Sequence, residues 1–346
     1  MSSLFNMSNN SNKGIHQYNS KTNYIDAMNI LKILMAFGIV YIHVIPPQIQ
    51  AEYAHNEPIF AYIHGFITEV LLRSCVPTFF LISGYLFFRD GINVDYYKKI
   101  GTRLKRYIPP YLIWNSIFLM IFFNVDYSFF DIINLYIKPI NFPLWFIRNL
   151  IAITICTPIM GYFISLHKFK TLITISIVYL LSDGNEECST IFYYTFGAIL
   201  AMNQKWFAHL LEKKFLLLVF FVLIIIFGNI AFGGIIWPNL YHSISKLISV
   251  LVNLSLVLSF FLKNNNSSFS NIILKYKCSF LLFVTHALII YVIYVYYPSF
   301  YKAENILKML CVYLFEPILI IITIYFFHSI FIRILPGKIN KYIGNY

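Results

Sequence analysis

Long apolar runs dominate this chain, and short polar breaks separate them. Because an α-helix rises about 1.5 Å per residue, apolar runs of roughly 20 residues match the hydrocarbon core of a bilayer. The pattern predicts an all-α, polytopic membrane helical bundle of about ten transmembrane helices. The predicted spans are residues 25–45, 58–88, 107–123, 143–165, 171–181, 190–202, 215–232, 243–262, 279–298 and 306–332.

Some of these spans have unusual lengths, so the count ranges from nine to eleven. The run 58–88 is long enough to tilt, to kink at Pro77 or to break near Arg73. The runs 171–181 and 190–202 are short for a bilayer. The same pattern divides the chain into an N-terminal tail, 1–24, a transmembrane domain, 25–334, and a C-terminal tail, 335–346.

Composition supports a membrane protein, and charge gives it an orientation. Hydrophobic residues make up 59% of the chain, charged residues 12%, and the mean hydropathy is +0.70. Alternate loops and the two tails hold 19 of the 26 Lys and Arg residues, whereas the remaining loops hold only Lys138 and Lys302. Because basic loops stay inside, we expect both termini in the cytoplasm and a multi-pass protein of the cell membrane. The net charge of +12 then needs no nucleic-acid partner.

Five cations remain within or at the edges of the predicted spans, namely Lys32, Arg73, Arg148, Lys246 and Lys308. A cation near the middle of a bilayer costs roughly 2.5 to 3.5 kcal/mol, so it is expected to face a partner or a cavity. Lys246 and Lys308 lie near span ends, where a long side chain can reach the interface. Lys32 and Arg73 lie deeper and are functional candidates, although Arg73 can alternatively pair with a glutamate one helical turn away.

The first predicted span carries the sharpest pair of candidates, Lys32 and His43. Eleven steps of about 100° return to nearly the same face of a helix, and they correspond to about 16 Å along its axis. With the N-terminus inside, Lys32 lies toward the cytoplasmic half and His43 near the outer end. The alternative is an interfacial histidine that anchors the helix end and a lysine that reaches inward toward Asp26.

Five short sequences occur in an order that resembles one known family. They are YIDAMNILKILMAFGIVYIH at 24–43, RSCVPTFFLISGYLFF at 73–88, KIGTRLKRYIPPYLIW at 99–114, PLWFIRNLIAITICTP at 143–158, and the segment 280–286 with its single histidine. Together they cover most of the chain and resemble the acyltransferase-3 family. In that family, a basic residue, ten residues and a histidine mark the first helix, and an Arg-x-x-Arg pair precedes a proline-broken third helix.

The resemblance implies ten helices with both ends inside and a membrane acyltransferase. Such an enzyme moves an acyl group, commonly acetyl from acetyl-CoA, to a hydroxyl of a surface polysaccharide or lipid-linked sugar. No resident cofactor is implied, since acyl-CoA is a co-substrate. Two departures are noted: Lys32 stands where many members have arginine, and the chain shows no appended SGNH-type hydrolase domain. We therefore expect a stand-alone surface-glycan O-acetyltransferase, or one that works with separate glycan-assembly proteins.

The resemblance and the chemistry of the side chains assign the following roles. His43 is the candidate general base or, alternatively, a covalent acyl carrier. Arg103 and Arg106, three residues apart on one helix face, can clamp the phosphates of acyl-CoA, unless they only follow the positive-inside rule. Lys32 and Arg73 can stabilise an oxyanion or guide the pantetheine arm.

Further residues are weaker candidates. Arg148 can meet an anionic lipid-linked acceptor, or it can anchor the helix at the aromatic belt. His286 is a second candidate base or substrate-binding residue, or a satisfied core histidine. Ser83 and Gly84 are expected to let helices approach closely rather than to supply a nucleophile.

Two further function classes are alternatives to the acyltransferase: a secondary transporter or flippase, and a membrane glycosyltransferase or ligase. The latter would need acidic residues or a larger acceptor-binding region in its outer loops, and those loops are short here. No metal site is expected, because no histidines, cysteines or carboxylates stand at ligand spacing. A secondary transporter or lipid-linked sugar flippase would also bury cations, but the inverted repeats typical of many transporters are not evident.

Overall fold

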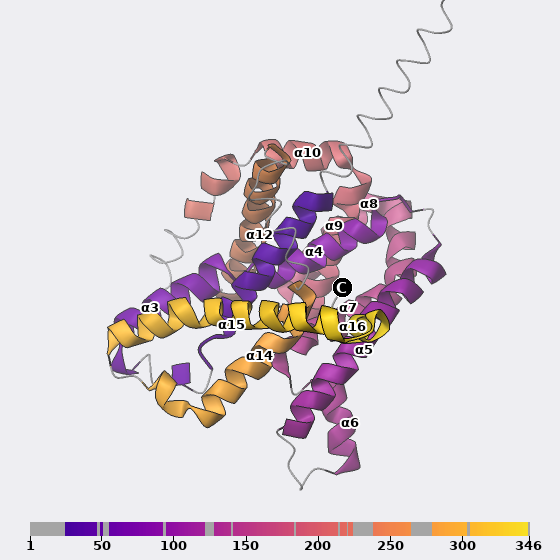
Figure 1. Cartoon of the computed structure of the whole chain (residues 1–346). Helices are drawn as coiled ribbons and strands as arrows, with labels where there is room; N and C mark the ends of the chain where they lie inside the picture. Colours follow the sequence, from indigo (N-terminus) through magenta and orange to yellow (C-terminus); the bar gives the residue numbers. More distant parts are fainter. Residues whose placement is uncertain are drawn as a thin grey trace, which may run out of the picture.

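The computed structural model describes residues 25–46, 49–50, 55–92, 95–121, 128–139, 141–182, 185–213, 215–219, 221–223, 238–263, 279–302 and 305–344 (Figure 1). Every regular element within these ranges is a helix, which confirms the predicted all-α class. They are the first helix (Ile25–His43), α3 (Pro58–Gly65), π-helix η1 (Phe66–Leu71), α4 (Cys75–Phe88), α5 (Tyr96–Ile121), α6 (Phe129–Ile137), η2 (Phe142–Leu144), α7 (Trp145–Ile155), α8 (Thr157–Leu181), α9 (Glu186–Met202), α10 (Gln204–Glu212), α12 (Pro238–Lys263), α14 (Ser279–Tyr296), η3 (Pro298–Tyr301), α15 (Ile306–Ile334) and α16 (Gly337–Tyr342).

By length and composition, four of the described helices could cross a bilayer: Ile25–His43, Ser243–Leu262, Ile306–Ile334 and Thr157–Leu181, although the last is divided at His167. Three shorter apolar helices, Cys75–Phe88, Phe142–Ile155 and Phe280–Tyr296, accompany them. Most of the predicted span 215–232 lies outside the described residues. Ten spans with cytoplasmic termini therefore stay a prediction.

The second predicted span is broken, as its length suggested. Helix α3 passes into π-helix η1, in which the amide of Leu72 donates to the carbonyl of Ile67, five residues earlier. A turn follows, and α4 begins at Cys75. The break includes Arg73, where the sequence analysis placed a possible break, whereas Pro77 lies in the first turn of α4, where the missing amide hydrogen costs no helical bond.

Helix α8 consists of two helical arms that meet at His167. His167 has non-helical backbone angles, φ −148° and ψ 68°. The hydroxyl of Thr171 donates to the carbonyl of Phe163 at 3.1 Å, although residues eight apart in a continuous helix are about 12 Å apart along the axis. The chain therefore reverses at His167, within the loop that the sequence placed between the fourth and fifth spans.

The third predicted span begins earlier than its apolar run. Helix α5 starts at Tyr96, so the basic segment that contains Arg103 and Arg106 is helical rather than a loop. The helix continues through Pro109 and Pro110. The prediction of a helix broken at these prolines, which the family resemblance implied, is therefore wrong. Packing against α7, α14 and α16 holds α5 together despite the two missing backbone donors.

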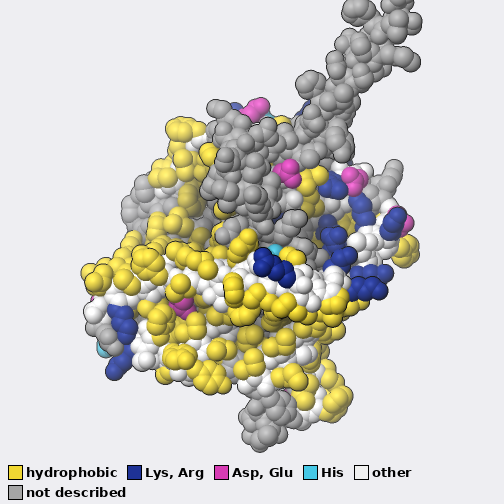
Figure 2. Space-filling model, viewed as in Figure 1, with side chains coloured by type: hydrophobic (Ala, Val, Ile, Leu, Met, Phe, Trp, Pro, Cys, Tyr) yellow, Lys and Arg dark blue, Asp and Glu magenta, His cyan; other side chains and the backbone are white. Residues whose placement is uncertain are grey.

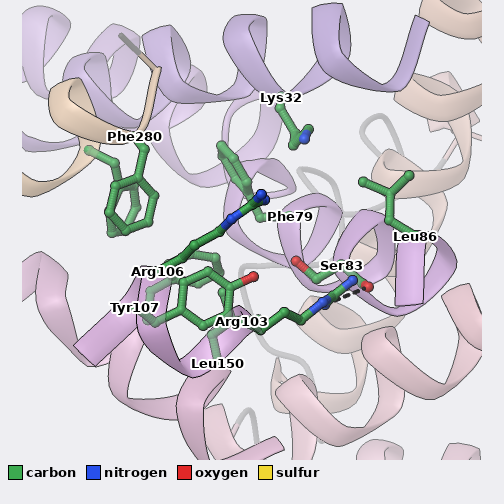
Figure 3. A pocket seen from close by; sticks show the side chains of 11 residues that line it. Lys32, Phe79, Ser83, Leu86, Arg103, Arg106, Tyr107, Leu150 and Phe280 are labelled. Carbon is green, nitrogen blue, oxygen red and sulfur yellow. Dashed lines mark hydrogen bonds between the residues drawn. The ribbon is translucent and has the colours of Figure 1, made fainter. Parts of the chain in front are cut away.

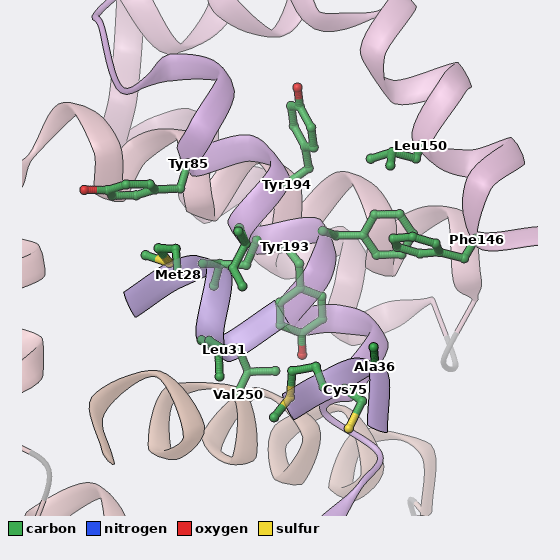
Figure 4. Packing of buried hydrophobic residues seen from close by; sticks show 14 of the residues in the cluster. Met28, Leu31, Ala36, Cys75, Tyr85, Phe146, Leu150, Tyr193, Tyr194 and Val250 are labelled. Atoms are coloured by element: carbon green, nitrogen blue, oxygen red, sulfur yellow. The ribbon is translucent and has the colours of Figure 1, made fainter. Parts of the chain in front are cut away.

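The core centres on the close contact of α4 with α9 (Figure 4). A Cβ atom on Gly84 would lie 1.9 Å from the carbonyl oxygen of Tyr194, and one on Gly197 would lie 1.9 Å from that of Leu81. Two glycines on facing helices thus bring the backbones into direct contact, which confirms the role expected for Gly84. Around this contact the first helix and α12 pack side chains such as Leu31 and Val250.

Large apolar side chains also cover the outside of the molecule. Helices α14 and α15 pack against each other, and hydrophobic side chains cover their outer face (Figure 2). On α15 the exposed residues include Phe315, Leu319, Ile322 and Phe326. An outward-facing apolar surface of this extent suits contact with lipid and supports a membrane protein.

Candidate active site

A cationic cavity of about 300 Å³ lies between the first helix, α4, α5, α7 and α14. Three of the predicted site residues, Lys32, Arg103 and Arg106, line it together (Figure 3). No described residue of the lining carries a carboxylate. The remaining lining residues are Phe79, Ser83, Leu86, Tyr107, Phe146, Leu150, Phe280 and Phe283.

Local structure explains how the three cations meet. Arg103 and Arg106 are less than one turn apart in α5, so they project from the same side of that helix. Arg103 is held in place, because its guanidinium donates to the carbonyl of Ser83 at 3.1 Å and lies 4.8 Å from the ring centroid of Phe87. Lys32 approaches from the opposite wall on the first helix. Three cations around one cavity repel each other, and a bound polyanion would relieve that repulsion.

The two candidate histidines form a second centre. The rings of His43 and His286 are stacked, with centroids 5.5 Å apart and an interplanar angle of 29°. The ring of Phe142, from η2, meets His43 edge-on at 5.7 Å. His43 is the last residue of the first helix, which ends just before Pro46, and His286 lies in the second turn of α14. Residues 243 positions apart thus share one site.

Hydrogen bonding assigns the tautomer of His286. The residue is fully buried, and its Nδ1 lies 3.0 Å from the carbonyl oxygen of Leu282. Since a carbonyl only accepts, Nδ1 carries the proton and Nε2 is left with its lone pair. Nε2 is buried and has no hydrogen-bond partner among the described residues. A buried, unpaired basic nitrogen is available to accept a proton from a bound hydroxyl group.

Aromatic side chains connect the cavity with the histidine pair. Phe283 lines the cavity, and its ring centroid lies 6.1 Å from that of His286. Phe146 and Phe79, which also line the cavity, lie 4.8 and 6.2 Å from Phe283 by the same measure. A continuous apolar wall therefore leads from the cations to the histidines.

Two predicted site residues lie elsewhere. Arg73 does not line the cavity, and its guanidinium pairs with Glu69 at 2.5 Å, the structural alternative considered from the sequence. Arg148 donates to the side chain of Asn149, to the carbonyl of Ile137 and to Glu187 at 3.2 Å. Arg148 thus ties the end of α6 to α7 and α9.

Asn141 is a candidate that the sequence analysis missed. It is fully buried and immediately precedes Phe142, and its side-chain amide donates to the carbonyl of Val284 at 3.1 Å, two residues before His286. Its Oδ1 has no partner among the described residues. An asparagine before an aromatic segment is unremarkable in a sequence, so only burial beside α14 marks it.

Metal ligands do not cluster in the part of the chain that the structure describes. No group of three or more His, Cys, Asp or Glu side chains there has the arrangement of a metal site.

Comparison with known proteins shows the family to which the chain belongs. The family described as an acyltransferase domain matches residues 25–332. A relative, the succinoglycan biosynthesis protein ExoH of Rhizobium meliloti (strain 1021), is 28% identical over 167 residues, which is 43% of this chain and 45% of the relative. The match therefore spans less than half of that relative's length. No solved structure matches the chain significantly. Because the family match covers most of its length, the chain belongs to the acyltransferase-3 family.

Proposed function

We propose that this protein transfers a short acyl group from acyl-CoA to a hydroxyl of a surface polysaccharide or of its lipid-linked precursor. The observation that carries the proposal is that a three-cation cavity and a stacked histidine pair are joined by one aromatic wall. The cavity suits a negatively charged donor, and the histidines suit the activation of a neutral hydroxyl. One chain thus holds the two groups that acyl transfer requires.

The cavity is proposed to receive the donor. Arg106, Arg103 and Lys32 supply charge for phosphate and for the polarised thioester, because guanidinium and ammonium groups bind such oxygens by charge-assisted hydrogen bonds. A volume of about 300 Å³ lies at the lower end of ligand pockets, which suits the reactive arm of acyl-CoA with an acetyl group rather than a long chain. Positive residues of α5 face the side that we expect to be cytoplasmic, where acyl-CoA is made.

The histidine pair is proposed to activate the acceptor. His286 Nε2, or His43 beside it, takes the proton as the acceptor oxygen attacks the thioester carbonyl carbon. A tetrahedral oxyanion forms, and Lys32 is the cation best placed on the first helix to stabilise it. The carbon–sulfur bond then breaks, the CoA sulfur receives the proton from the histidine, and the products are an ester and free CoA. The alternative is a two-step transfer: a ring nitrogen of His43 attacks the thioester carbon and the CoA thiol leaves, and the acceptor hydroxyl then attacks the acyl-histidine, loses its proton and releases the histidine.

The acceptor class rests on two supports. The name of the relative refers to succinoglycan biosynthesis, and this supports a polysaccharide acceptor for the present chain. Buried unpaired acceptors at His286 Nε2 and Asn141 Oδ1 suit the hydroxyl groups of a sugar. Arg148 and Arg73, whose charges are already paired, are proposed to position helices rather than to bind the acceptor.

The test is acyl transfer by purified protein in lipid vesicles, with labelled acetyl-CoA and the polysaccharide fraction of the host cell. His286→Gln and His43→Gln are expected to lower kcat by about 10²- to 10⁴-fold while CoA binding persists, as for the loss of a general base. Arg106→Gln is expected to weaken CoA binding instead, whereas Lys32→Met is expected to weaken CoA binding and also to lower kcat, because Lys32 is proposed to stabilise the oxyanion. His209→Gln, an exposed histidine of α10, is the control and is expected to match wild type.

A transporter would give a different outcome. If wild-type protein attaches no label, and sugar crosses the vesicle membrane unmodified, the acyltransfer proposal is refuted. Full activity of both histidine variants would refute the assignment of the base while leaving the reaction class intact.

A further inference from the structure

A second cationic hollow lies outside the proposed active site. It is a groove of about 820 Å³, to which α4, α8 and α10 contribute cations. Three of the basic segments that the sequence places inside, near Arg89, Lys168 and Lys205, meet there. No described residue of its lining is acidic, and none is shared with the cavity at Lys32. The full lining is Arg89, Gly91, Ile92, Ser165, Lys168, Ala201, Met202, Asn203, Gln204, Lys205 and Trp206.

Among the described residues, ion pairing of the three cations is limited to Arg89. Oδ1 of Asp90 lies 3.6 Å from Nε of Arg89. The other oxygen of Asp90 is bound by Lys99 at 3.1 Å, so this carboxylate is shared between two cations. Lys168 and Lys205 bring further positive charge from α8 and α10. The groove is therefore a site of net positive charge that favours an anion with several oxygen atoms.

The surroundings of the groove favour a lipid over a free anion. Trp206 lines the groove, is 46% exposed, and packs edge-on against Phe169 with centroids 5.1 Å apart. On the other arm of α8, before His167, Phe163 and Leu166 are exposed next to Ser165, which lines the groove. An apolar surface thus continues directly from the cationic groove. A lipid with an anionic head group can bind the cations of the groove and place its hydrocarbon chains on the apolar surface, whereas free phosphate can bind only the cations.

Helix α10 has the composition of a helix that lies in the membrane interface. Phe207 and Leu211 are buried against the bundle, whereas Lys205 and Trp206 are exposed. Such a helix places its aromatic and basic side chains at the level of lipid head groups. Since α10 forms one wall of the groove, the groove opens at that level.

We propose that this groove binds the phosphate head group of an anionic phospholipid from the inner leaflet. The lipid phosphate accepts hydrogen bonds from Arg89, Lys168 and Lys205, and its chains lie along the outer surface of α8 beside Phe163. The bound lipid would clamp α4, α8 and α10 together at one end of the bundle. This binding does not depend on the acyltransfer proposal, because it is measured on the protein without donor or acceptor.

The experiment is native mass spectrometry of the purified full-length chain, titrated in detergent with phosphatidylglycerol. The test variant is Arg89→Gln/Lys168→Gln/Lys205→Gln. The control variant, Lys213→Gln/Lys338→Gln/Lys341→Gln, removes the same charge from exposed residues that do not line the groove. Wild type and control are expected to retain phosphatidylglycerol equally. The test variant is expected to bind it at least about tenfold more weakly, because charge-assisted hydrogen bonds to phosphate are lost.

Competition identifies the occupant. Phosphatidylcholine, inorganic phosphate and CoA are added in separate arms, and none is expected to displace phosphatidylglycerol at an equal concentration. If CoA displaces it, the groove is part of a donor site and the lipid proposal is overturned. Equal loss of binding in the two triple variants would mean that the lipid is attracted by the overall positive charge. Unchanged binding in the test variant would mean that the groove is not the site. Either result overturns the proposal.

A single surface variant keeps the test valid if the triple variant misfolds. The exposed single variant Lys205→Glu reverses one charge without touching the core and is expected to weaken phosphatidylglycerol binding on its own. Normal binding by this variant, together with a misfolded triple variant, would also overturn the proposal.

Discussion

Replacing Gly84 by alanine tests the tightest contact in the molecule. The added Cβ would lie 1.9 Å from the carbonyl oxygen of Tyr194, 2.8 Å from its carbonyl carbon and 3.1 Å from its Cα. All three atoms belong to the backbone of α9, so no flexible side chain can move aside. Helix α4 carries Phe79, Ser83 and Leu86 into the cationic cavity, and a shift of α4 therefore reaches the site.

The expected magnitude follows from the missing space. Ordinary contact begins at 3.4 Å, so α4 and α9 must separate locally by about 1.5 Å. Overpacking of this kind typically costs about 1 to 3 kcal/mol, and a backbone obstacle favours the upper end. Alanine regains up to about 1 kcal/mol of helix propensity relative to glycine. The net loss in the free energy of unfolding is therefore about 2 kcal/mol, and separation of the helices would also loosen the cavity.

Gly101→Ala is the matched control, because Gly101 lies within α5 and its added Cβ would meet nothing within 4 Å. This variant is expected to be neutral or more stable by up to about 1 kcal/mol. Unfolding by SDS in mixed micelles, followed by intrinsic fluorescence, compares the two variants. The expected difference of about 3 kcal/mol corresponds to roughly a 100-fold change in the unfolding equilibrium. A difference below about 0.5 kcal/mol would refute the close approach of α4 and α9.

Three further predictions follow from the site and the topology. Phe283→Leu opens the wall between cavity and histidines, so transfer of butyryl relative to acetyl should rise in an acyl-CoA series; an unchanged ratio would contradict the role of this wall. Arg148→Gln should cost about 1 kcal/mol in the free energy of unfolding, since its partner Glu187 is largely exposed. Glu187→Gln should cost less, because Arg148 keeps its hydrogen bonds to Asn149 and to the carbonyl of Ile137, and it should add nothing in the double variant. In a chain freed of its own cysteines, Lys170→Cys should react with an impermeant thiol reagent only from the cytoplasmic side and Lys138→Cys only from outside; the reverse pattern would invert the topology.

Patterns along the chain were sufficient for the fold class and for much of its organisation. Apolar runs predicted helices close to those observed, for example 306–332 against Ile306–Ile334 for α15, because the length of a spanning helix is set by its hydrophobic stretch. The length of the apolar run 58–88 indicated the break that includes Arg73. Helix boundaries were poorest at α5, where a basic stretch forms about three turns of helix before the apolar run begins.

Candidate site residues were found from the sequence because buried charge is costly and therefore rare in a spanning segment. That argument identified Lys32, Arg73 and Arg148, without separating a cation that faces a cavity from one that is already paired. Pairing depends on side chains from other helices, such as Glu187 on α9, and a single sequence does not place these in space.

The tertiary structure alone decided which candidates share a site. Periodicity placed Lys32 and His43 on one face of the first helix, since helical geometry is local and repeats every 3.6 residues. It did not bring His286 onto His43 or place Asn141 beside Val284, because these contacts join residues 243 and 143 positions apart in the chain. Local hydrophobicity determines that helices form and enter a membrane, whereas their packing determines where polar groups meet, and the chemistry depends on that packing.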